Sequence, residues 1–165
     1  MKKKFLAVFL VLVLAMSMVA CGSSADAPEA TPSNEAETES EANAGSGTLG
    51  DYAVSINDAR FGTDDEGNKV IVISYDFTNN SDESASAMWS LVTKAFQNGI
   101  ELESAYYVEG IDYNDENEDK EIKPGATITD CQCAFTLDDD SDVEFEISEF
   151  ISFSDNVVKK TFTVQ

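Results

Sequence analysis

The feature that most constrains the fold is an alternation of apolar and polar residues with a period of two, from Tyr52 onward. Tyr52, Val54 and Ile56 alternate with polar neighbours, and the residues of 143–147 do the same. Successive side chains of a strand point to opposite faces of a sheet, so this pattern predicts half-buried β-strands. Apolar residues at helical spacing are scarce.

The stretch KVIVISYDFTNN at 69–80 is the most apolar of these predicted strands. One face carries four large side chains: Ile71, Ile73, Tyr75 and Phe77. Val70 and Val72 partly fill the other face, which indicates a central strand, and the polar run from Asn79 ends it.

Turn signals separate the strands. Asn98-Gly99 is the preferred pair for a type I′ turn, which would bring Phe96 and Ile100 together across a tight hairpin. Lys123-Pro124-Gly125 and Asp138–Asp142 read as further turns. Seven to nine short strands without a long helix predict an all-β sandwich, in which Trp89 is a candidate core anchor.

The N-terminus has the layout of a secretion signal. Lys2, Lys3 and Lys4 precede an apolar run at 5–18 that is too short to span a bilayer comfortably. The following SMVACGSS resembles a bacterial lipobox, although Met18 stands where Leu, Val or Ile is usual. This resemblance implies lipidation of Cys21 and anchoring to the cell membrane on its extracytoplasmic face. The alternative is an ordinary secretory signal cleaved near Ala20, with Cys21 incidental.

Three regions are therefore predicted: a lipoprotein signal peptide at 1–20, Cys21 with an acidic linker at 21–50, and one folded domain at 51–165. The linker consists mainly of small and acidic residues and Pro and contains no aromatic residue, so it is expected to stay disordered. After the signal peptide we expect no membrane-spanning helix.

The net charge of the chain limits the kinds of partner that it can bind. The chain has 10 basic and 32 acidic residues, a net charge of −22, and removal of the signal peptide takes away three lysines but no acid. Such a chain repels nucleic acid and anionic lipid headgroups, and it attracts cations or a basic partner. A solvated acidic surface is the simpler interpretation.

Four segments together resemble a known family: VISYDFTNNSDES, KAFQNGIELE, IKPGATIT and FTLDDDSDVEFEI. They are similar to an immunoglobulin-like domain of unknown function found in lipoproteins of Gram-positive bacteria and related to secreted immunoprotective extracellular antigens. The resemblance covers roughly residues 50 to 155 and implies an immunoglobulin-like antiparallel sandwich. Its motifs are structural, so it implies no activity, and bulky residues are usual where this chain has Cys131 and Cys133.

The residue inventory argues against catalysis. Histidine is absent and Arg60 is the single arginine, which removes His-dependent nucleophilic sites and leaves little for a bidentate anion clamp. The chain has no phosphate-binding glycine motif. We therefore predict no enzymatic activity, no catalytic residues and no cofactor.

Calcium is the one cofactor that the acids suggest. The loop DYNDENEDKE at 112–121 offers oxygen ligands, of which the candidates are Asp112, Asn114, Glu116 and Glu118. The loop fails as an EF-hand, because Asn117 takes the glycine position and Lys123 that of the bidentate Glu. A solvated charge run is the alternative.

TDCQCAF at 129–135 could be a redox pair, a soft-metal clamp or core filling. Residues i and i+2 of a strand share a face, so Cys131 and Cys133 should face the core with Phe135. Parallel side-chain directions would strain a disulfide between them, and no His completes a metal site. Both thiols are expected to be buried and unbonded.

Taken together, the sequence predicts a monomeric domain that binds an envelope protein, a peptide or a glycan. The candidate contacts are loops 79–86 and 112–121 and the aromatic residues Tyr106, Tyr107 and Tyr113. A calcium-responsive structural module is the main alternative, and an accessory lipoprotein of a transport or secretion system is a more remote one.

Overall fold

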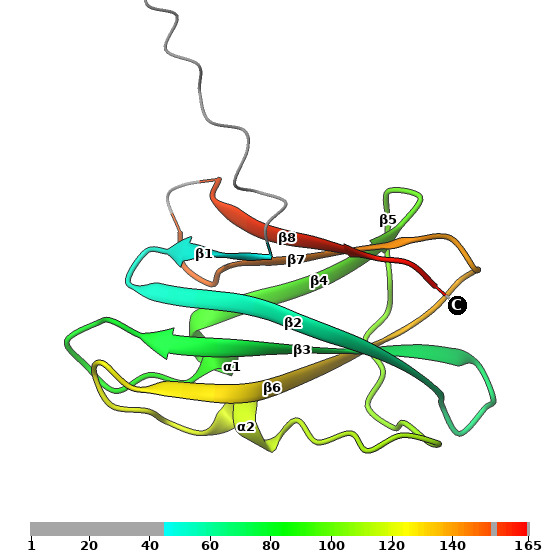
Figure 1. The fold of residues 1–165 in the computed structure, drawn as a ribbon, viewed down its shortest axis with the longest axis horizontal. Helices are drawn as coiled ribbons and strands as arrows, with labels where there is room; N and C mark the ends of the chain where they lie inside the picture. The colour runs from blue at the N-terminus through cyan, green and yellow to red at the C-terminus, as the bar shows by residue number, and fades with distance from the viewer. Residues whose placement is uncertain (1–44, 153–154, 165) are drawn as a thin grey trace, which may run out of the picture. The chain divides into compact units, whose positions relative to one another are not determined.

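Two antiparallel sheets form a sandwich in the computed structural model, which describes residues 45–152 and 155–164 (Figure 1). The first sheet has the order β1 (Ser46–Leu49), β2 (Tyr52–Thr63), β3 (Lys69–Asn79) and β6 (Thr127–Thr136). The second has the order β5 (Ile100–Glu101), β4 (Leu91–Gln97), β7 (Val143–Glu149) and β8 (Val157–Phe162). Two four-residue helices, α1 (Ala87–Ser90) and α2 (Glu116–Asp119), complete the regular structure of the described residues. The all-β sandwich expected from the sequence is confirmed.

The core lies between the two sheets and follows the period-two pattern. Ile71, Ile73, Tyr75 and Phe77 of β3 are fully buried there, as predicted. Cys131 and Cys133 of β6 lie on the same inner face, opposite Tyr75 and Ile73 in the strand register. Across the gap, the rings of Phe135 and Phe145 meet edge to face with centroids 6.0 Å apart.

The outer face of β3 is also covered. Val70 and Val72 are buried beneath residues 103–113, which we call the covering segment. Its apolar contacts are Ala105, Val108, Ile111 and Tyr113. In Figure 1 this segment is the yellow-green trace that connects β5 with α2. β3 is therefore a central strand with apolar contacts on both faces.

Backbone hydrogen bonds hold the covering segment to the sheet. The Ala105 amide donates to the Ala134 carbonyl at 2.8 Å, and Thr63 and Glu109 exchange two bonds. Gly62 permits the close approach, because a Cβ there would lie 2.6 Å from the Glu109 carbonyl oxygen.

One predicted boundary needs correction. Ser46–Leu49 was assigned to the disordered linker, but it forms β1 beside β2, and Leu49 is only 1% exposed. The residues from Gly45 to Thr48 have the composition of a linker, so Leu49, the apolar residue that anchors the strand, did not stand out in the sequence. The signal peptide, Cys21 and the rest of the linker lie outside the described residues. Within the described part of the chain, no helix is long and apolar enough to cross a membrane.

The Asn98-Gly99 turn forms with both residues at positive φ, as the sequence predicts. The predicted pairing is one residue wrong, because a two-residue turn pairs the residues that flank it directly. Gln97 therefore lies opposite Ile100, and Phe96 opposite Glu101. Trp89 is not a core anchor either: it lies on α1 and is 70% exposed.

Buried amide side chains organise the loops at both ends of the sandwich. Gln97 donates to the carbonyls of Asp139 and Ser141 and accepts from the Asp138 amide, which closes the 138–142 turn. Asn79 donates to the carbonyls of Glu83 and Ile122 and accepts from Ser81. Both amide side chains are buried, and buried polar groups are normally hydrogen-bonded, so these bonds tie the loops to the sandwich.

Replacing Asn79 with alanine is expected to lower the free energy of unfolding by about 1–3 kcal/mol, since it leaves buried polar groups without partners. Asn80→Ala is the matched control, because this neighbouring side chain is exposed, and its effect should stay within about 0.5 kcal/mol. Urea unfolding followed by tryptophan fluorescence measures both values. Equal stability of the two variants would show that Asn79 does not hold the loops.

Candidate functional site

The predicted contact residues Tyr106 and Tyr107 stand on the surface. Their exposed fractions are 77% and 73%, the largest among the exposed aromatic residues of the described chain. They follow Ala105, which is anchored to β6 by its amide, so the two rings project from a fixed part of the covering segment. Aromatic side chains held on a rigid backbone lose little conformational entropy on binding.

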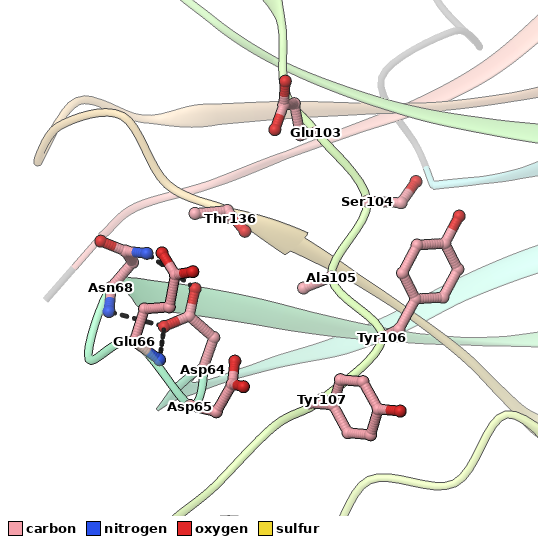
Figure 2. A pocket seen from close by; sticks show the side chains of 10 residues that line it. All are labelled: Asp64, Asp65, Glu66, Asn68, Glu103, Ser104, Ala105, Tyr106, Tyr107 and Thr136. Atoms are coloured by element: carbon pink, nitrogen blue, oxygen red, sulfur yellow. Dashed lines mark hydrogen bonds between the residues drawn. The ribbon is translucent and has the colours of Figure 1, made fainter.

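A shallow pocket of about 260 Å³ lies between these tyrosines and the β2–β3 hairpin. Figure 2 shows both rings on one side and the hairpin side chains of residues 64–68 on the other. Four carboxylates line this pocket: Asp64, Asp65, Glu66 and Glu103. No basic side chain lines it.

The hairpin that carries three of these acids is well ordered by its own hydrogen bonds. The Asp64 carboxylate accepts from the amides of Glu66 and Asn68, at 3.0 and 2.8 Å, and from the Asn68 side chain. The bond from the Asn68 side chain lowers the pKa of Asp64 below its ordinary value. Asp64 therefore stays ionised and fixes the loop, while Asp65 and Glu66 border the pocket beside it.

Two aromatic rings next to several carboxylates suit a cationic group. The face of an aromatic ring attracts an ammonium or guanidinium ion, and carboxylates accept its hydrogen bonds. The pocket holds no cysteine and no lysine that could act as a nucleophile, and its only hydroxyl donors are Ser104, Thr136 and the two tyrosines.

Tyr113 does not join this surface. It is half-buried against the outer valines of β3, where burial raises the pKa of its phenol well above the ordinary value. The sequence grouped it with Tyr106 and Tyr107 because all three lie in one aromatic-rich stretch. The covering segment turns one of them inward and leaves the other two at the hairpin.

The four calcium candidates are placed differently from one another. Asp112 and Glu116 are exposed, and Asn114 uses its side-chain oxygen to accept from the Glu116 amide at 2.8 Å. Glu118 turns toward the sandwich and accepts a hydrogen bond from the Tyr75 hydroxyl. Among residues 45–152 and 155–164, no three His, Cys, Asp or Glu side chains are arranged to hold a metal ion. No feature of the structure favours the calcium alternative, which stays a prediction.

The predicted contact loops 79–86 and 112–121 do come close together. Ala85, in the first loop, exchanges two backbone hydrogen bonds with Ile122, just beyond the second. Neither loop contains the Tyr106–Tyr107 pair, which lies with the β2–β3 hairpin. The acidic run DDEG at 64–67 was the sequence signal that could have indicated the hairpin side of the pocket. Asp and Gly are also common in turns, so the run alone did not point to a binding site.

Both core thiols are free and buried, as the strand period predicts. Burial raises the pKa of Cys131 to about 12, and it raises the pKa of Cys133 well above its ordinary value. Gln132, which lies between the two cysteines in the sequence, is also buried and accepts a hydrogen bond from the Asn114 amide.

Comparisons with known proteins agree with this architecture. A family model described as a domain of unknown function (DUF5067) matches residues 27–149. The fold resembles that of a candidate lipoprotein from Staphylococcus aureus, with a TM-score of 0.53, 18% identity, and coverage of 72% of this chain and 92% of that one. A candidate lipoprotein from Bacillus subtilis (ycdA) has a TM-score of 0.53 at 12% identity, over 73% of this chain and 38% of that one.

An uncharacterised β-sandwich protein from Clostridium difficile has a TM-score of 0.50 at 16% identity, over 76% of this chain and 93% of that one. At these identities the likeness concerns the fold. No curated protein matches the chain.

In the folded protein at about neutral pH, both core thiols should react with N-ethylmaleimide at least about a hundredfold more slowly than in the unfolded chain, because reaction requires local opening and a thiolate. Peptide mass spectrometry follows Cys131 and Cys133 separately from Cys21. Rapid labelling of either one would contradict its placement in the core.

Proposed function

We propose that this chain, which belongs to the DUF5067 family of domains of unknown function, is a lipid-anchored protein of the extracytoplasmic membrane face whose sandwich binds a partner without catalysis. The partner we propose is a basic segment of an envelope protein or peptide. The exposed Tyr106–Tyr107 pair beside four carboxylates carries this proposal.

The anchor rests on the N-terminal sequence. Three lysines, an apolar run and Cys21 after a small residue follow the lipoprotein pattern, and β1 begins only at Ser46. Residues 22–45 therefore connect the lipidated cysteine to the sandwich. Two proteins of similar fold, from Staphylococcus aureus and Bacillus subtilis, are described as candidate lipoproteins.

Electrostatics favours a basic partner over an acidic protein or a nucleic acid. The net charge of −22 gives a negative field that draws in cationic groups and repels phosphate backbones. The pocket adds specificity to this general attraction, since a lysine or arginine side chain can contact a tyrosine face and a carboxylate together.

The binding proposal predicts that Tyr106→Ser with Tyr107→Ser weakens affinity for a short lysine- and arginine-rich peptide by about tenfold, because two ring contacts worth about 0.5–1 kcal/mol each are lost. Isothermal titration calorimetry at low salt measures this change. An acidic peptide of equal length is the ligand control and should not bind.

A charge-matched pair of variants separates the pocket from the overall charge. Asp65→Asn with Glu66→Gln should weaken binding, whereas Asp82→Asn with Glu83→Gln removes the same charge from the opposite loop and should change it little. Equal weakening by the two charge variants, with native affinity in the tyrosine variant, would mean that only net charge attracts the peptide, and the proposed pocket would then be wrong.

The anchor has its own test. Cys21→Ser should release the protein into the medium or leave the precursor unprocessed, because the residue that accepts the lipid is gone. Fractionation of cells followed by immunoblotting detects both outcomes. A variant that is processed and retained in the membrane as before would rule out the lipid anchor at Cys21.

A further inference from the structure

The helix α2 covers the edge of the sandwich at β6 and packs against α1. Its residue Glu118 turns inward, and the hydroxyl of the fully buried Tyr75 donates to its carboxylate at 2.6 Å. A carboxyl group taken out of water in this way is costly to ionise unless a cation compensates it.

No cation does so in the described chain. The ion pairs there involve Lys69, Lys94 and Lys159, all with other acids, and Lys120 bonds to the Asn117 side chain. Two ionisable groups act on Glu118, Tyr75 of β3 and Asp115 before α2, and neither is a cation. Glu118 in turn acts on Tyr113 and on the two thiols of β6, Cys131 and Cys133. Asp76, Asp130 and Lys120 act on the adjacent Cys131, and α1 has no titratable side chain.

The side-chain hydrogen bonds from α2 to β6 join uncharged groups. Asn117 donates to the carbonyls of Thr129 and Asp130 at 3.1 and 3.2 Å. These bonds attach α2 to β6 at a β-bulge, where Asp130 has a φ of +57° and the pairing with β3 shifts register. Glu118 is thus the titratable contact between α2 and the sandwich interior.

We propose that α2 is a pH-gated cover over Cys131 and Cys133, closed while Glu118 is protonated and released when Glu118 ionises. Release moves the ionised Glu118 carboxylate from the edge of the sandwich into water, and it breaks the hydrogen bonds of Asn117. The thiols gain access to solvent in the open form. This device does not involve the Tyr106–Tyr107 pocket and is independent of the proposed binding function.

The direction of the effect follows from linkage. Burial, the largest influence, raises the pKa of Glu118 from 4.5 to about 7, and Asp115 adds to this while the Tyr75 hydrogen bond opposes it. In the open form the carboxyl returns to its ordinary pKa, so the closed form binds the proton more tightly. Closure is therefore favoured fully below the ordinary pKa, weakens as pH rises through the raised pKa, and levels off above it.

Peptide-resolved alkylation of the full-length protein tests the gate. At each pH, the alkylation rate of Cys131 or Cys133 in the unfolded chain is divided by its rate in the folded protein. This ratio is the protection factor, and it cancels the intrinsic titration of the thiol. The resulting protection should fall by about tenfold between roughly pH 5.5 and pH 8.5 in the native protein. Hydrogen exchange should show the same loss in residues 112–121, while the Phe145 amide in β7 stays protected.

Three variants make the test decisive. Glu118→Gln cannot ionise and should keep nearly constant protection, whereas Asp119→Asn, on the exposed side of α2, should behave like the native protein. Tyr75→Phe should move the midpoint to higher pH, because the lost hydrogen bond favoured the charged form. Constant protection in the native protein, an unchanged pH dependence in Glu118→Gln, or loss of Phe145 protection together with that of α2 would each overturn the proposal.

Discussion

The structure depends on the burial of both faces of β3. Its inner face carries Ile71, Ile73, Tyr75 and Phe77, which only a second sheet can cover, and its outer face carries Val70 and Val72. Leaving two valines in water would forgo about 1.5–3 kcal/mol for each. The long connection after β5 meets this need by running back across the sheet.

The position of that connection decides where its aromatic and acidic side chains lie. Ala105, bonded to β6, fixes the start of the covering segment, so Tyr106 and Tyr107 emerge beside the β2–β3 hairpin and its carboxylates. The same segment leads into α2, which brings Glu118 to Tyr75 at the edge of the sandwich. The proposed binding surface and the buried carboxyl are thus two consequences of covering one strand.

Period-two patterning predicted most of the strands and the buried thiols, and the Asn98-Gly99 pair predicted the turn, because each depends on local geometry that the chain specifies within a few residues. It could not predict the covering segment, since Ala105, Val108, Ile111 and Tyr113 have neither strand nor helix spacing. Their shared face is set by contact with Val70 and Val72, some thirty to forty residues earlier in the chain. For the same reason the sequence grouped Tyr113 with the exposed tyrosines and placed Glu118 among solvent-facing acids.

The most direct test of this dependence is hydrogen exchange in a Val70→Thr, Val72→Thr variant. Threonine keeps the shape of valine but places a hydroxyl beneath the covering segment, which favours access of water there. The amides of Ala105 and Glu109 should lose protection by roughly tenfold or more, while the Phe145 amide in β7 is nearly unchanged. Full protection of Ala105 and Glu109 in this variant would contradict the view that the outer face of β3 holds the segment in place.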